Sequence, residues 1–224
     1  MNNIEMNKNT YEDKYSKGYG IQYPESHIIR IYEHYIKDII GEKSNLLDYG
    51  CGNGTHDIYF MEKGINVCGV DISEKAIEIC NKRIEDGKFY LVDKDNDLLK
   101  DIFNEKFDII FANQVLYYLS DEELQKKLYE MNDVLNENGI VIFTMMSSEN
   151  YYFKHAKKLN DNSGLYEVNL NGRLNETTYI NFVKGADDLK EKFSMFNPLY
   201  IGKYDFDMKE GSSEHYFYIG KKLG

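Results

Sequence analysis

Apolar residues recur with two different periods along the first two thirds of the chain. Between Glu25 and Ile40 they recur every three or four residues, which predicts an amphipathic helix. From Asn45 onward, short apolar runs alternate with helix-period segments. We expect strands at residues 45–49, 65–71, 88–93, 106–113 and 139–146, and intervening helices at residues 55–63, 73–85 and 121–135. Buried strands that alternate with helices predict a parallel sheet with helices on both faces.

The last third of the chain departs from this alternation. The segment from Ser148 to Val183 is rich in turn-forming residues, and we expect it to be irregular. A helix is expected at Ala186–Phe193, followed by strands at residues 198–208 and 214–223 that a Gly-Ser-Ser stretch separates. This spacing predicts an antiparallel hairpin. The expected fold is therefore α/β, with a seven-stranded, mostly parallel sheet that ends in an antiparallel hairpin.

Size and charge narrow the class of protein. A chain of 224 residues with 42% hydrophobic and 29% charged residues is expected to form one globular domain, residues 1–224. Its 27 Lys and Arg residues against 38 Asp and Glu residues give a net charge of −11. This charge disfavours a nucleic acid as partner, because nucleic-acid binding rests largely on basic side chains. We expect a monomer or a homodimer.

The sequence shows no sign of membrane insertion or secretion. No apolar run approaches the ~20 residues that span a bilayer, and no signal peptide opens the chain. The three cysteines, Cys51, Cys68 and Cys80, form no CxxC pair, which suggests neither a disulfide framework nor a metal site. We therefore expect a cytoplasmic protein with no membrane partner and no metal.

The stretch "LLDYGCGNG" places three glycines, Gly50, Gly52 and Gly54, directly after the first predicted strand. Glycines at a strand-to-helix turn let a ligand approach the backbone closely. The spacing is GxGxG and not the GxGxxG of dinucleotide-binding loops, and the carboxylate of Asp48 beside it would repel a pyrophosphate. Asp71 ends the second strand, where an acid can accept hydrogen bonds from a ribose diol. The pattern indicates a positively charged nucleoside without phosphate, which describes S-adenosylmethionine (SAM).

Five stretches together resemble the successive motifs of class I SAM-dependent methyltransferases: "LLDYGCGNG", "VCGVDIS", "FYLVDKD", "FDIIFANQVLYYL" and "NENGIVIFTMM". The opening "YPESHIIRIYEHYI" and closing "EHYFYIGKK" resemble small bacterial methyltransferases of the tellurite-resistance type. This resemblance implies a Rossmann-like methyltransferase fold, SAM as methyl donor and S-adenosylhomocysteine (SAH) as product. It also implies an N-terminal arm or lid (residues 1–24), a SAM-binding core (25–146), an acceptor-site segment (147–185) and a closing helix and hairpin (186–224).

The resemblance further implies which residues contact the donor. They are Asp48 at the methionine amino group, Gly50, Gly52 and Gly54 under the methionine and ribose, Asp71 with Ile72 at the ribose, Asp93 with Lys94 at the adenine, Asn113 and Gln114 at the methionine carboxylate or reacting centre, and Tyr15 on the donor side.

Two groups of side chains are candidates for the rest of the site. Tyr11, Tyr15, Tyr19 and Tyr23 recur every fourth residue, so they would share one helical face. That face fits either a lid over the ligands or a packing stripe, and Tyr23 is the expected contact on the donor side. A hydroxyl acceptor needs a base, for which we expect His155 or His215, whereas a neutral amine needs little help.

The function expected from these patterns is methyl transfer from SAM to an oxygen or nitrogen atom of a small metabolite, sugar or surface-glycan precursor. The fourth strand ends in "ANQV", without the Asp/Asn-Pro-Pro-Tyr/Phe tetrad of many nucleic-acid methyltransferases. Two alternatives stay open. One is a nicotinamide-dependent (NAD) oxidoreductase with an altered glycine loop, and the other is a non-catalytic SAM-binding protein.

Overall fold

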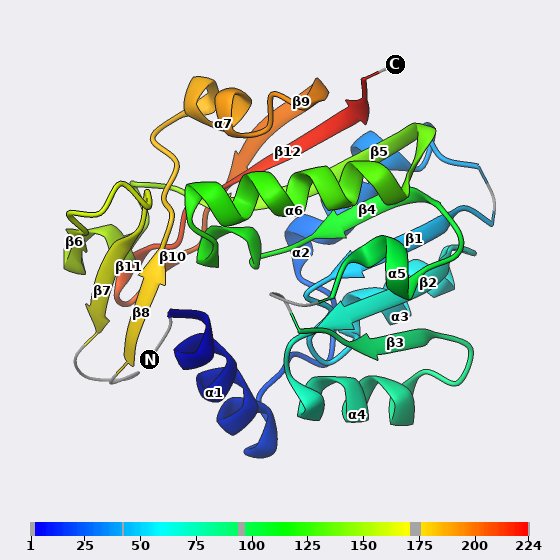
Figure 1. The fold of residues 1–224 in the computed structure, drawn as a ribbon, viewed down its shortest axis with the longest axis horizontal. Coiled ribbons are helices and arrows are strands. Elements are labelled where there is room, and N and C mark those ends of the chain that lie inside the picture. Colours follow the sequence, from blue (N-terminus) through cyan, green and yellow to red (C-terminus); the bar gives the residue numbers. More distant parts are fainter. Residues whose placement is uncertain (1–2, 42, 94–96, 171–175, 224) are drawn as a thin grey trace.

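The computed structural model describes residues 3–41, 43–93, 97–170 and 176–223. A seven-stranded sheet in the order β3-β2-β1-β4-β5-β12-β9 runs through the molecule (Figure 1). Its strands are β1 (Asn45–Tyr49), β2 (Asn66–Asp71), β3 (Lys88–Leu91), β4 (Phe107–Ala112), β5 (Leu135–Met146), β9 (Phe196–Tyr204) and β12 (His215–Lys222). Strands β1 to β5 are parallel, whereas β12 pairs antiparallel with both β5 and β9. The predicted mostly parallel sheet with an antiparallel hairpin is confirmed.

Helices cover both faces of this sheet, as the sequence predicts (Figure 1). One face carries α2 (Ser26–Ile31), α3 (Thr55–Glu62) and α4 (Glu74–Arg83), and the other carries α5 (Leu99–Ile102), α6 (Asp121–Val134) and α7 (Ala186–Lys192). Strand β4 shows the alternation directly. Ile109 and Phe111 pack on the face covered by α2, α3 and α4, whereas Ile110 and Ala112 pack on the face covered by α5, α6 and α7. Successive side chains of a strand point to opposite faces of a sheet.

Side-chain caps define the starts of two helices. Ser73 precedes α4, and its hydroxyl accepts from the Ala76 amide at 3.1 Å, as a Ser N-cap does. Ser120 and Glu123 form a capping box at the start of α6. Near the N-terminus, the helix predicted from Glu25 to Ile40 is shorter, because α2 ends in a π-helical turn, Tyr32–Ile36.

The segment predicted to be irregular, from Ser148 to Val183, instead contains a second sheet. Antiparallel strands β6 (Ala156–Lys158), β7 (Tyr166–Leu170) and β8 (Glu176–Ile180) follow a 3-10 turn, Tyr151–His155. Buried Val168 and Leu170 alternate with outward residues, but each strand is too short for this alternation to stand out between turn formers. The prediction of an irregular segment was therefore wrong.

The carboxyl ends of the parallel strands face two accessory pieces. In Figure 1 the arrowheads of β2, β3 and β4 point toward the small sheet and toward the N-terminal helix α1 (Asn3–Ser16). A short pair of strands, β10 (Asp207–Met208) and β11 (Gly211–Ser212), extends the hairpin toward the same side. In the described part of the chain, no helix has the length and apolar character needed to cross a membrane.

Candidate functional site

The strand order reverses between β1 and β4, and open α/β sheets bind their ligands at the carboxyl ends beside such a reversal. A cavity of about 510 Å³ opens there, which we call the glycine-loop cavity. Eight of the residues predicted to contact the donor line it: Tyr15, Asp48, Gly50, Gly52, Asp71, Ile72, Asn113 and Gln114. They come from α1 and from the ends of three strands, so the fold brings them together from 100 residues of sequence.

The glycines of the loop adopt left-handed backbone conformations, with φ of 84° at Gly50, 56° at Gly52 and 75° at Gly54. A Cβ atom at Gly52 would lie 2.6 Å from the Tyr15 hydroxyl, on the cavity side. Gly54 has a packing role instead, because a Cβ there would lie 2.7 Å from Ile84 Cδ1, at the end of helix α4. The prediction that Gly54 contacts the ligand is therefore not supported, since Gly54 does not line the cavity.

Asp71 links the end of β2 to the glycine loop. Its Oδ2 accepts from the Gly52 amide at 2.9 Å, and its Oδ1 accepts from the Ser73 amide at 2.9 Å. Burial raises the pKa of this carboxyl, while the backbone donors act in the opposite direction. Each carboxylate oxygen has a second lone pair, so Asp71 can still accept two hydrogen bonds from a diol in the cavity.

Asp48 forms a buried acid pair with Asp57 of α3. The two residues are 2% and 0% exposed, and burial raises the pKa of both carboxyls, with the charge of Asp57 adding to the effect on Asp48. Among the described residues, both carboxyl oxygens of Asp57 are buried without a hydrogen-bond partner, so burial beside a second acid favours a proton on this pair. Asp48 lines the cavity, so a positively charged group bound there can replace this proton and stabilise the ionised carboxylate.

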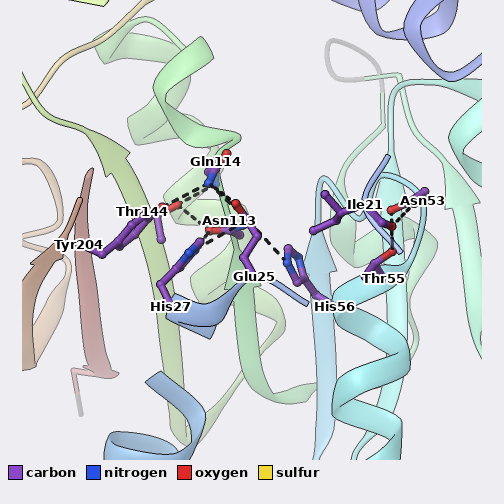
Figure 2. Close-up of polar contacts among 10 residues, drawn as sticks. All are labelled: Ile21, Glu25, His27, Asn53, Thr55, His56, Asn113, Gln114, Thr144 and Tyr204. Carbon is purple, nitrogen blue, oxygen red and sulfur yellow. Dashed lines mark hydrogen bonds and ion pairs between the residues drawn. The ribbon is translucent and has the colours of Figure 1, made fainter. Parts of the chain in front are cut away.

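A polar network closes the cavity at the end of β4 (Figure 2). Asn113 Nδ2 donates to Glu25 Oε2 at 3.1 Å, while Asn113 Oδ1 accepts from the Thr144 hydroxyl at 3.1 Å. Gln114 Nε2 lies 3.3 Å from both Glu25 oxygens, and Gln114 has a φ of 55°. Such a conformation is strained in a residue other than glycine, and it is maintained here by the Gln114 amide donating to Thr144 Oγ1 at 2.7 Å.

Glu25 and His27 were not among the site residues predicted from the sequence, whereas their partner Asn113 was. Glu25 lies 88 residues before Asn113, with no motif to join them. His27 Nε2 donates to Asn113 Oδ1 at 3.2 Å, and its ring stacks on Tyr204 with centroids 3.7 Å apart. The one local signal is the position of Glu25 directly before the helix that begins at Ser26.

A second cavity of about 940 Å³, which we call the tyrosine cavity, adjoins the first. Both predicted bases line it. His215 is buried and stacks on Tyr204; its Nδ1–H donates to the Ser213 carbonyl at 2.7 Å, which leaves an unprotonated Nε2 without a hydrogen-bond partner. Burial lowers the pKa of His215 to about 4. His155, by contrast, is exposed.

The N-terminal arm lies against both cavities. The Tyr11 hydroxyl is 2.7 Å from that of Tyr118, and Tyr15 is buried beside the glycine loop. Glu12 accepts from the Ser73 hydroxyl at 2.6 Å, which fastens α1 to the start of α4. Tyr23 behaves differently from the expectation. It is 81% exposed and lines neither cavity, although Ile21 and Glu25 on either side of it line the glycine-loop cavity.

The expected adenine contacts are the least supported. Val92 lines the glycine-loop cavity, but Asp93 is exposed and does not, and its amide donates to Asp97 Oδ2 at 2.8 Å. Lys94 lies outside the described residues. Across those described ranges, no group of three or more His, Cys, Asp or Glu side chains is arranged to hold a metal ion.

Comparison with known sequences identifies a family. Residues 40–195 match the family described as a methyltransferase domain. An uncharacterised methyltransferase of Bacillus cytotoxicus is 26% identical over 132 residues, which cover 58% of this chain and 60% of that protein. The chain spans about half the length of the curated relatives it matches.

Solved structures share the fold at low sequence identity. A SAM-dependent methyltransferase from Anabaena variabilis has a TM-score of 0.74 at 14% identity, covering 100% of this chain and 96% of that one. TehB from Haemophilus influenzae has a TM-score of 0.62 at 17% identity, covering 95% of this chain and 67% of that one. The match of residues 40–195 to a methyltransferase domain argues against the alternative of a nicotinamide-dependent oxidoreductase. The family match shows that this chain belongs to the methyltransferase domain family, and its fold is shared with SAM-dependent methyltransferases.

Proposed function

We propose that the glycine-loop cavity binds SAM and that the tyrosine cavity binds a small molecule, to which a methyl group is transferred on oxygen or nitrogen. The observation that carries this proposal is the shared wall of the two cavities, formed by Tyr11, Tyr19, Glu25, Gln114 and Tyr118. In-line displacement requires donor and acceptor to meet across such a boundary, with water kept out.

The residues of the glycine-loop cavity fit the donor. Asp71 offers two remaining acceptor positions to the ribose hydroxyls, and Gly52 leaves free the space that a Cβ would take. Asp48 supplies the acid for the methionine ammonium. When bound, SAM supplies a methyl group activated by a sulfonium.

The size of the tyrosine cavity supports a small-molecule acceptor, since ligand pockets usually measure ~300–1,000 Å³. The net charge of −11 argues against a nucleic acid in this cavity. For a hydroxyl acceptor, the free Nε2 lone pair of His215 is the better-placed base, because it is buried and faces the cavity. His155 can contribute from the exposed rim.

We also propose that the N-terminal arm acts as the lid of both cavities. Its Tyr11 reaches Tyr118 on the shared wall, and the Ile21 carbonyl accepts from Asn53 Nδ2 at 2.8 Å, as Figure 2 shows. The arm must release at least some of these contacts when SAM enters and SAH leaves.

The test combines binding and turnover. Titration calorimetry with SAH and with NAD should give binding to SAH alone. Incubation with SAM and a panel of small amines and alcohols, followed by mass spectrometry, should reveal a product that has gained one methyl group. Absence of SAH binding would overturn the donor assignment. Methylation of added RNA or protein, with none of the small molecules modified, would overturn the small-molecule acceptor.

A further inference from the structure

Glu25 is the carboxylate that the two cavities share among their described lining residues. Its side chain is 30% exposed and lies directly before α2, at the boundary where the methyl group must cross. Asn113 and Gln114 both direct amide N–H groups toward it, at 3.1 and 3.3 Å (Figure 2). Burial raises the pKa of this carboxyl, while the two amide donors act in the opposite direction and orient its oxygens toward the boundary.

Among the described residues, this carboxylate has neutral rings as its nearest basic groups. The ring nitrogens nearest to it are His56 Nε2 at 3.7 Å and His27 Nε2 at 3.9 Å. Burial lowers the pKa of each of these histidines to about 4, so both are neutral at pH 7. Tyr204, which reaches Gln114 at 3.3 Å, is also neutral, since burial raises its pKa.

The tyrosine cavity presents aromatic faces to whatever lies next to Glu25. Seven tyrosines and one phenylalanine are among its described lining residues, together with a second acid, Glu210, and one lysine, Lys14. Ring faces attract positive charge, and Lys14 demonstrates this in place, because its Nζ lies 4.8 Å from the centroid of the Tyr11 ring. Aromatic faces combined with a carboxylate favour a ligand that carries an amine.

We propose that the methyl acceptor is an amine on an apolar or aromatic body, and that Glu25 accepts a hydrogen bond from its nitrogen beside the donor cavity. This proposal rests on the proposed function of the two cavities. The ammonium ion first loses a proton to solvent, and the amine reacts as the free base. Its lone pair forms the N–C bond, the C–S bond breaks with its electron pair on sulfur, and the positive charge passes from sulfur to nitrogen.

A carboxylate at this position stabilises the charge where it develops. The nitrogen becomes positive as the bond forms, and Glu25 attracts it most strongly in the transition state, which is the condition for accelerating the reaction. A hydroxyl acceptor would gain less, because its oxygen must lose a proton to a base. The free Nε2 of His215 can accept a second N–H of the amine in the same cavity.

The test uses matched probes that differ in one group, 2-phenylethylamine and 2-phenylethanol. In the presence of saturating SAH, calorimetry should detect binding of the amine and at least about tenfold weaker binding of the alcohol. With SAM, mass spectrometry should detect N-methylation of the amine. Binding or methylation of the alcohol alone, or of neither probe, would overturn the amine assignment.

Glu25→Gln keeps the shape of the side chain and removes its charge. We expect this variant to bind SAH within about tenfold of the wild type, to bind the amine about tenfold more weakly, and to transfer methyl about 100-fold more slowly. Glu33→Gln, which removes a surface carboxylate paired with Lys63, is the control and should behave like the wild type. Unchanged transfer by Glu25→Gln would overturn the role of Glu25. If the wild type itself does not bind SAH, the proposed function of the two cavities is wrong, whatever the effect of Glu25→Gln.

Discussion

The backbone amide of Gly52 donates to Asp71 Oδ2 at 2.9 Å, so the glycine loop after β1 and the carboxyl end of β2 are connected directly. The same carboxylate also accepts from the Ser73 amide, at the start of α4. Asp71 therefore has two functions in the proposed donor site. It shapes the loop, and it offers its remaining lone pairs to the ribose.

Asp71→Ala should weaken SAM binding by about 2 kcal/mol, or roughly 30-fold, because hydrogen bonds to a charged group contribute about 1.5–3 kcal/mol. Asp71→Asn keeps one acceptor oxygen, so its affinity for SAM should lie between those of the wild type and Asp71→Ala. Calorimetry with SAM or SAH measures both. Asp108→Ala is a matched control, since Asp108 accepts from the Asn45 amide at 2.9 Å at the opposite end of β1. An equal loss of affinity in this control would show that general destabilisation explains the result.

The two candidate bases should separate in kinetics. His215→Ala removes the buried Nε2 and should lower kcat/KM for the acceptor at least about tenfold while leaving the Kd for SAM unchanged. His155→Ala removes an exposed ring and should change kcat/KM less than about threefold. The ratio of kcat/KM between wild type and His215→Ala should increase as the pH rises through about 4, where the His215 ring loses a proton. It should stay constant from pH 6 to 8. A larger loss in His155→Ala would reverse the assignment.

The glycine loop allows a comparison of two similar substitutions. Gly52→Ala and Gly54→Ala both place a Cβ on a left-handed residue, which costs about 1–2 kcal/mol in each case. Gly52→Ala should additionally lower SAM affinity, because its Cβ points toward Tyr15 in the cavity. Gly54→Ala should lower Tm by several degrees with little change in SAM affinity, since its Cβ meets Ile84 and Cys80. Calorimetry and thermal unfolding check these outcomes, and the reverse pattern would contradict the packing role of Gly54.

Features that depend on neighbours in the sequence were predictable. The strand at Asn45–Tyr49 has the predicted bounds, and Asp48 and Asp71 line the cavity as expected, because a strand end fixes where its next residues lie. The roles of Gly52 and Gly54 differ despite their equal spacing. What separates them is the helix α4 behind Gly54, a tertiary neighbour that no local pattern reveals.

Contacts between distant segments were beyond the sequence pattern. The network of Glu25 with Asn113 and Gln114 joins residues 88 and 89 positions apart, and a lone Glu before a helix resembles any surface acid. Tyr23 was misplaced because the fourfold tyrosine spacing extends past the end of α1 at Ser16, where the chain stops being helical. Periodicity predicts a shared face only while one helix continues.

The buried acid pair of Asp48 and Asp57 should make stability depend on pH. Burial raises the pKa of Asp57 in the folded protein, so above the ordinary carboxyl pKa the folded state binds more protons than the unfolded state, and stability falls as pH rises. Asp57→Asn removes this loss. Since each pKa unit corresponds to about 1.36 kcal/mol, the variant should exceed the wild type by at least about 1 kcal/mol at pH 8, or ~2–4 °C in Tm.

This advantage of Asp57→Asn should shrink as the pH is lowered toward 5, because the wild-type pair is then protonated in the folded state. Thermal unfolding without ligand at a series of pH values measures it, and Asp38→Asn, at an exposed position, controls for loss of one negative charge. Added SAM should reduce the difference at pH 8, since its ammonium would compensate the charge of Asp48 in the wild type. Parallel Tm profiles for wild type and Asp57→Asn would mean that the pKa of Asp57 is not raised in the folded protein.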